Sequence, residues 1–177
     1  MTDTRRQISP VKTIAVCSIL ASITAVMQLS AVFVPAFGHV LSAFCALPVA
    51  IATVVRPAGG IFTTTVAALI VMTVQPLEVP VLLFTSAPLG LVLGSGLVTG
   101  RQRWLTVAAG AIVFFAGTAL LTYTAGQVVS GGPFGASALY RMLAFNALFS
   151  LLYAGAWEVF VRKIVTRLSL FFPYLRH

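Results

Sequence analysis

Charged residues are scarce in this sequence. They make up 8% of its 177 residues, and only three of them are acidic, Asp3, Glu78 and Glu158. Soluble domains carry roughly 25% charged residues. A composition this poor in charge excludes a water-soluble surface, so lipid must surround most of the chain.

The shortage of acidic and sulfur ligands also limits metal and proton chemistry. A hard cation prefers several oxygen ligands, which three scattered acids do not supply. The same shortage disfavours a proton-coupled carrier, although Glu78 or Glu158 alone is an alternative proton carrier. Cys17 and Cys45 lie inside apolar runs without metal-site spacing, so they are predicted to be packing residues. We predict neither a metal site nor a cofactor.

Catalytic motifs are missing as well. The segment LGSG around Ser95 invites comparison with a serine protease, but no histidine is placed to activate this serine. The two histidines are His39, predicted on the other side of the membrane, and His177 at the C-terminus. No Walker A motif occurs, so the chain cannot power transport by itself. The sequence therefore does not predict an enzyme.

Long apolar runs, by contrast, fill the chain. Each is long enough to cross a bilayer as a helix and is bounded by charges, by proline or glycine turns, or by polar clusters. The runs cover residues 13–34, 39–55, 57–74, 79–100, 104–129 and 138–165. They are continuously apolar rather than alternating, which argues against strands. The sequence predicts an all-α integral membrane protein with six transmembrane helices in one membrane domain, residues 1–177.

The basic residues predict how these helices are oriented. Ten of the eleven lie on one side of a six-span arrangement, and only Arg141 lies on the other. Because Lys and Arg collect on the cytoplasmic side, both termini are predicted to be cytoplasmic, in a multi-pass protein of the cell membrane. The net charge of +8 thus reflects topology rather than nucleic-acid binding. A twin-arginine signal or a cleaved signal peptide at the N-terminus is the alternative, and removing the first run would spoil this charge pattern.

The segment VVRPAGGIF, residues 54–62, separates the second run from the third. Arg56 is predicted to mark a cytoplasmic turn of a helical hairpin. Pro57 suits the first turn of the next helix, where its missing N–H costs nothing. Gly59 and Gly60 are expected to let this helix start pack closely against its neighbours.

Residues 15–100 resemble the S components of energy-coupling factor transporters, which are six-span, substrate-binding membrane proteins of vitamin and metal uptake systems. The resemblance rests on Ala21 and Ala25 in a small-residue stripe, on the segments VPAFG (34–38) and LPVAIA (47–52), and on RPAGG (56–60). The last segment departs from the family's usual turn, because Arg56 stands where the family often has glycine.

The resemblance implies a function and partners. Such a protein binds one small molecule near the outer face and associates with a membrane-embedded coupling protein that two cytoplasmic ATPases drive. It also implies that Ala21 and Ala25 form the docking face for the coupling protein. The alternative is that both alanines pack inside this chain, since small residues generally mediate close helix contacts in lipid.

Polar residues predicted to lie in the outer half of the membrane are candidates for the binding site, because polar groups in membrane helices are expensive and often functional. The predicted substrate-binding residues are Gln75, Glu78, Thr85, Tyr123, Gln127, Arg141 and Asn146. Arg141 can bind a carboxylate or phosphate through two hydrogen bonds. It can equally snorkel to water or pair with Glu78. Arg141 and Asn146 are about 140° apart on a helix, so they are not expected to face one pocket together.

Two other functions remain open from the sequence. The chain is alternatively a structural or assembly subunit of a membrane complex, or a small secondary carrier that works without ATPases. A face formed by Asn146, Ser150, Tyr153 and Trp157 lines the pocket or simply packs. Glu158 is expected to pair with Arg162 four residues later, near the cytoplasmic end of the last helix.

Overall fold

The computed structural model describes residues 9–34, 37–130 and 136–171; the side chains of residues 125–130, 136–139 and 171 are outside this description. Within these ranges the chain is helical and has no strand. The elements are α1 (Pro10–Phe33), α2 (Phe37–Ala43), α3 (Ala46–Val55), α4 (Pro57–Val74), α5 (Glu78–Val81), the π-helical turn η1 (Leu82–Ser86), α6 (Ala87–Val98), α7 (Arg103–Ser130) and α8 (Ala136–Phe171).

Six helical stretches are long and apolar enough to cross a membrane, which confirms the predicted number of spans. They are Pro10–Phe33, Phe37–Val55, Pro57–Val74, Glu78–Val98, Arg103–Thr124 and Tyr140–Leu170. Two of them are not single regular helices, because the second contains α2 and α3 and the fourth contains α5, η1 and α6. The last helix, α8, runs beyond residue 165, the predicted end of the sixth span.

The turn at Arg56 forms as the sequence predicts. Arg56 is extended, with φ −162° and ψ 132°, and Pro57 is the first residue of α4. A Cβ atom on Gly59 would lie 2.8 Å from Cys17 Sγ and 3.0 Å from the Ala52 carbonyl oxygen. The missing side chain therefore lets the start of α4 approach both α1 and α3.

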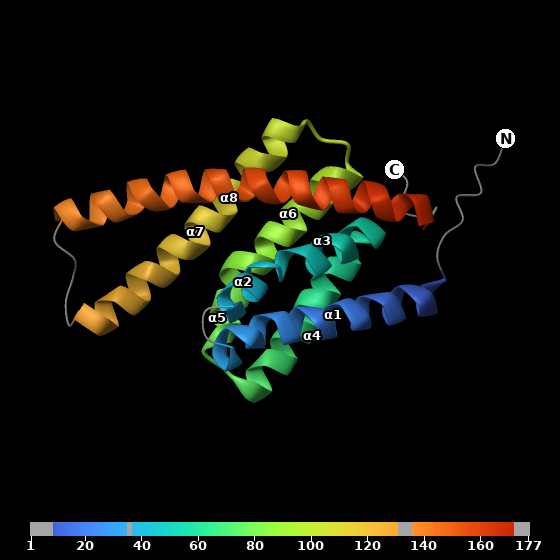
Figure 1. Cartoon of the computed structure of the whole chain (residues 1–177), viewed down its shortest axis with the longest axis horizontal. Coiled ribbons are helices and arrows are strands. Elements are labelled where there is room, and N and C mark those ends of the chain that lie inside the picture. Colours follow the sequence, from blue (N-terminus) through green and yellow to red (C-terminus); the bar gives the residue numbers. More distant parts are fainter. Residues whose placement is uncertain (1–8, 35–36, 131–135, 172–177) are drawn as a thin grey trace.

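Among the described residues, buried apolar side chains form two clusters between the helices; Figure 1 shows how these helices are arranged. One group joins α3 and α6 to α7 and α8 and includes Ala50, Leu93 and Trp157. The other joins α1 to α4 and to the region around η1, and it includes Ala21, Ala25 and Val71. Both cysteines are buried free thiols, as predicted for packing residues.

Glycines set the contact between α3 and α6. A Cβ atom on Gly90 would lie 2.6 Å from the Ala46 carbonyl oxygen, and one on Gly94 would lie 2.6 Å from that of Ala50. A Cβ atom on Gly96 would lie 2.5 Å from the side chain of Thr106 in α7. Gly100, after the end of α6, has φ 62° and no atom within 4 Å of such a Cβ position. Gly90, Gly94 and Gly96 thus serve packing within the chain.

The second span is interrupted between α2 and α3, and a carbonyl group at the interruption has a side-chain partner. The hydroxyl of Tyr153 in α8 donates a hydrogen bond to the Ala43 carbonyl oxygen at 3.1 Å. The Cys45 thiol, also at the interruption, donates to the Thr24 carbonyl oxygen of α1 at 3.4 Å. Since lipid offers no hydrogen bonds, partners of this kind are what permits an irregular segment at this depth.

The fourth span contains the π-helical turn η1, and α7 crosses it at a glycine. The space beside Gly117 is filled by the carbonyl group of Phe84, so no side chain fits there. Turns of this kind often occur at functional sites. Here the turn fixes where α7 passes the fourth span.

Gly94→Ala is expected to lower the free energy of unfolding by about 1–3 kcal/mol, because the new methyl group meets a backbone carbonyl that cannot move aside. Thermal unfolding in detergent micelles measures the change. Gly155→Ala is the matched control, since a Cβ atom there has its nearest neighbour, Val107 Cγ1, at 3.9 Å. Equal stability of the two variants would contradict the packing assigned to Gly94.

Candidate functional site

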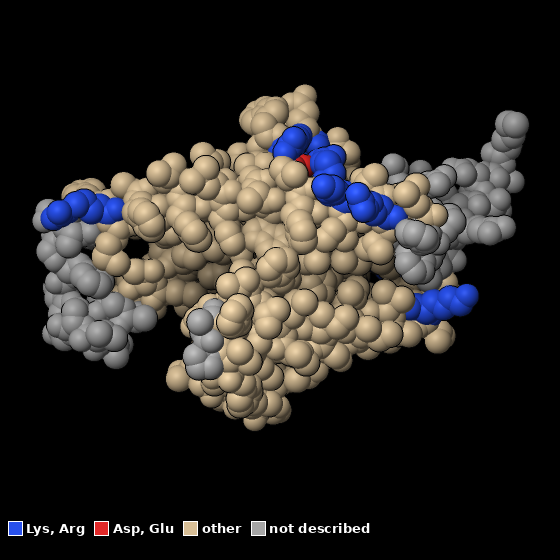
Figure 2. Space-filling model, in the orientation of Figure 1, with Lys and Arg blue, Asp and Glu red and all other residues tan. Residues whose placement is uncertain are grey.

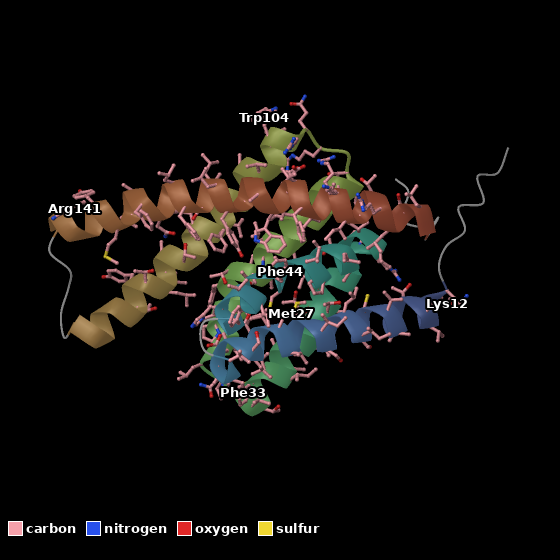
Figure 3. All side chains as sticks on the ribbon, in the orientation of Figure 1. Lys12, Met27, Phe33, Phe44, Trp104 and Arg141 are labelled. Carbon is pink, nitrogen blue, oxygen red and sulfur yellow. The ribbon has the colours of Figure 1, made fainter. Side chains whose placement is uncertain are left out.

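A cavity lies between α7 and α8. Lys12 and Arg141 mark opposite ends of the molecule, called here the Lys12 end and the Arg141 end (Figure 3). The two helices separate toward the Arg141 end (Figure 1). The cavity has a volume of about 440 Å³ and is lined by Ala119, Thr122, Tyr123, Met142, Leu143, Phe145 and Asn146.

The wall of this α7–α8 cavity is mostly apolar, with two aromatic rings and one amide. Tyr123 is 52% exposed and Phe145 is 73% exposed, so both rings are accessible rather than buried in the core. Ligand sites are typically apolar concavities with a few fixed polar groups. The α7–α8 cavity has that composition.

Asn146 is held in place by residues of both helices. Its Oδ1 lies 2.9 Å from the Thr118 hydroxyl of α7 and 3.4 Å from the Ser150 hydroxyl of α8. A side chain fixed from two sides loses little further entropy when it binds a ligand. Asn146 therefore presents a preorganised amide in the cavity wall.

Beyond the cavity, aromatic side chains continue along α8. Phe145 stacks toward Phe149 with ring centroids 6.5 Å apart, and Phe149 lies 5.6 Å from Tyr153. Tyr153 stacks on Phe114 of α7 at 4.6 Å. The contact between Phe114 and Tyr153 joins α7 to α8 where the two helices converge.

Of the α8 face predicted from the sequence, Asn146 alone lines the cavity. Ser150 and Trp157 are buried, and Tyr153 packs among the aromatic rings. The face is thus divided between lining the cavity and packing inside the protein.

The structure divides the predicted binding residues between several places. Tyr123 and Asn146 share the α7–α8 cavity. Arg141 is exposed and is not among the lining residues, in agreement with its angle from Asn146. Gln127 lies in α7, but its side chain is outside the described part of the chain.

The remaining predicted residues belong to the region between α4 and α6. Gln75 ends α4 and is half-buried. Thr85 is buried in η1, and its hydroxyl donates to the Val81 carbonyl oxygen. The Glu78 carboxylate accepts a hydrogen bond from Gln28 Nε2 at 2.7 Å, and no ion pair with Arg141 occurs among the described residues.

Ala21 and Ala25 lie inside the chain's own core. Their exposed fractions are 0% and 1%, and they pack with Ala67 and Val71 of α4. This placement favours the alternative, packing within the protein, over the docking face that the resemblance implies, because a buried residue offers no surface to a partner.

Glu158 connects α7 and α8 at the ends opposite the cavity. It is 2% exposed and forms the predicted ion pair with Arg162, at 2.6 Å. Its other oxygen accepts a hydrogen bond from Arg103 Nε of α7 at 2.7 Å, a contact that the sequence did not reveal. Figure 2 shows this carboxylate enclosed by basic side chains.

Comparison of the chain with protein-family models, with curated proteins and with solved structures found no match.

Glu158→Gln is expected to lower the free energy of unfolding by about 1–3 kcal/mol, because two arginines then face a neutral group. The effect should lie toward the smaller value, since both arginines reach solvent and water screens them. Thermal unfolding in detergent tests this expectation. Lys163→Gln, at an exposed neighbouring position, is the control; a loss as large in the control would show that the Arg103–Glu158–Arg162 contact is not responsible.

Proposed function

We propose that this chain is the substrate-binding S component of an energy-coupling factor uptake transporter. It binds a small, vitamin-like molecule in the α7–α8 cavity, at the outer face of the cell membrane. A membrane coupling protein driven by cytoplasmic ATPases carries out the transport. The observation that carries the proposal is the cavity itself, in which two accessible rings and one fixed amide meet.

The size and composition of the cavity support a small-molecule site. Its volume of about 440 Å³ falls within the range of roughly 300–1,000 Å³ that is usual for ligand pockets. Tyr123 and Phe145 offer ring surfaces suited to a flat or cyclic molecule, and Asn146 offers one directional polar contact. A structural subunit has no need of this combination.

The need for partners follows from what the chain lacks. It has no Walker A motif, so uptake driven by ATP hydrolysis requires an ATPase on another subunit. Because Ala21 and Ala25 are internal, the coupling protein must dock on a different face. The opposite side of α1 is accessible, with Ile19 62% and Val26 70% exposed. Ser22 lies between them, and its hydroxyl is already bonded to the Ser18 carbonyl oxygen.

Native mass spectrometry of the protein, extracted gently from its own host's membranes, tests the binding site. The wild-type chain is expected to carry one small molecule. Tyr123→Ala and Asn146→Leu should each weaken its retention by about tenfold or more, as expected for losing a buried ring contact or a fixed hydrogen bond. Leu148→Ala is the matched control on α8, because Leu148 is 59% exposed and does not line the cavity.

Two outcomes would contradict this assignment. A molecule retained equally by all variants would place the site elsewhere in the chain. A ligand-free chain bound to an unrelated membrane protein would favour the structural subunit instead.

A further inference from the structure

A second polar site lies between α1 and α5, away from the residues that line the α7–α8 cavity. Gln28 is 0% exposed, and its Nε2 donates to the Glu78 carboxylate at 2.7 Å. The other end of the same amide, Oε1, is buried, and within the described residues it has no hydrogen-bond partner. A buried amide oxygen without a hydrogen-bond partner thus lies near the half-buried carboxylate of Glu78.

The carboxylate of Glu78 lacks a positive partner in the described part of the chain. The ion pairs found there all belong to Glu158, which two arginines neutralise. An ionised carboxylate within a membrane protein is costly unless it is paired. Glu78 therefore favours any ligand that brings a positive charge.

The geometry of the amide places both acceptors within reach of one small group. The oxygen and nitrogen of an amide are about 2.3 Å apart, so Gln28 Oε1 lies no more than about 5 Å from Glu78 Oε2. Turning the amide over would set its oxygen against the carboxylate, so an ionised Glu78 selects the observed orientation.

We propose that Gln28 and Glu78 bind a primary ammonium group. Such a group brings a positive charge to the carboxylate, and its several N–H donors satisfy the amide oxygen at the same time. A metal ion fits less well, because no three potential metal-ligating side chains gather anywhere in the described residues. The hydroxyl of nearby Thr24 is bonded to the Leu20 carbonyl oxygen, so it too is engaged.

This site goes beyond the proposed transport function and does not rest on it. Its residues come from α1 and α5, whereas the cavity is built by α7 and α8. The ammonium group belongs either to a separate small cation or to a substrate that reaches both places. A test with a simple amine addresses the site whichever source supplies the group.

Methylammonium chloride is the probe, and thermal unfolding of the purified chain in detergent is the measurement. Methylammonium is expected to raise the melting temperature of the wild-type protein in a saturable way. Glu78→Gln should weaken this binding by at least about tenfold, because the charge is lost while the shape is kept. Gln28→Met should weaken it several-fold and serves as the second variant if Glu78→Gln does not fold.

The controls distinguish a specific ammonium site from a general effect of cations or salt. Tetramethylammonium, which has the charge but no N–H donor, should give no shift, and neither should sodium. Glu158→Gln, which removes the buried carboxylate at the contact between α7 and α8, should keep the methylammonium shift. The Tyr123→Ala, Asn146→Leu double variant should also keep it, which would separate this site from the α7–α8 cavity; loss of the shift there would place the methylammonium in the α7–α8 cavity and overturn the proposal.

Several results would overturn the proposal. An absent shift in the wild-type protein, or an equal shift in Glu78→Gln, would exclude binding at Gln28 and Glu78. An equal shift with sodium would show that the site binds a metal cation rather than an ammonium group. A Glu78→Gln protein as stable as the wild type, with neither protein responding to methylammonium, would mean that the Gln28–Glu78 hydrogen bond serves packing alone.

Discussion

Close approach of helix backbones at small residues holds this protein together, and the other features follow from it. Lipid is as apolar as a leucine side chain, so burying apolar surface does little to drive helices together. Gly94 against the Ala50 carbonyl and Gly117 against the Phe84 carbonyl show how near the backbones come. Small side chains such as Ala50 therefore lie at the helix contacts, while many large ones, such as Leu148, face outward. A binding site forms only where this close packing ends.

The α7–α8 cavity is such a place. Toward the Lys12 end, Glu158 and the aromatic contacts around Tyr153 hold the two helices together. Farther along, the hydrogen bond between Thr118 and Asn146 is a cross-helix contact just before the cavity opens. Because α7 and α8 pack together at one end and separate at the other, a cavity is left between them. The amide of Asn146 in its wall is already held in position. The Glu78–Gln28 pair lies outside this arrangement, because a different helix, α1, supplies the amide.

The sequence predicted the coarse fold, because hydrophobic length and charge are local properties. The six spans and the role of Pro57 followed directly from residue order. The break between α2 and α3 and the π-helical turn did not, since both depend on partners distant in sequence, such as Tyr153 for the Ala43 carbonyl. The rotation and tilt of each helix could not be predicted from the sequence either. For that reason a stripe containing Ala21 indicated a helix contact but not which partner it contacts.

The candidate site was predictable only through its polar members. Tyr123 and Asn146, the latter the single asparagine of the chain, stand out in an apolar background. Met142 and Phe145 give no such signal, because nearly every neighbour is apolar as well. The central claim, that this chain binds substrate for an ATPase-driven transporter, is tested most directly by cross-linking it to its neighbours in intact host cells and identifying the attached subunits. We expect one integral membrane protein and, joined to it, subunits with a Walker A motif. A cross-linked assembly without any nucleotide-binding subunit would contradict the claim.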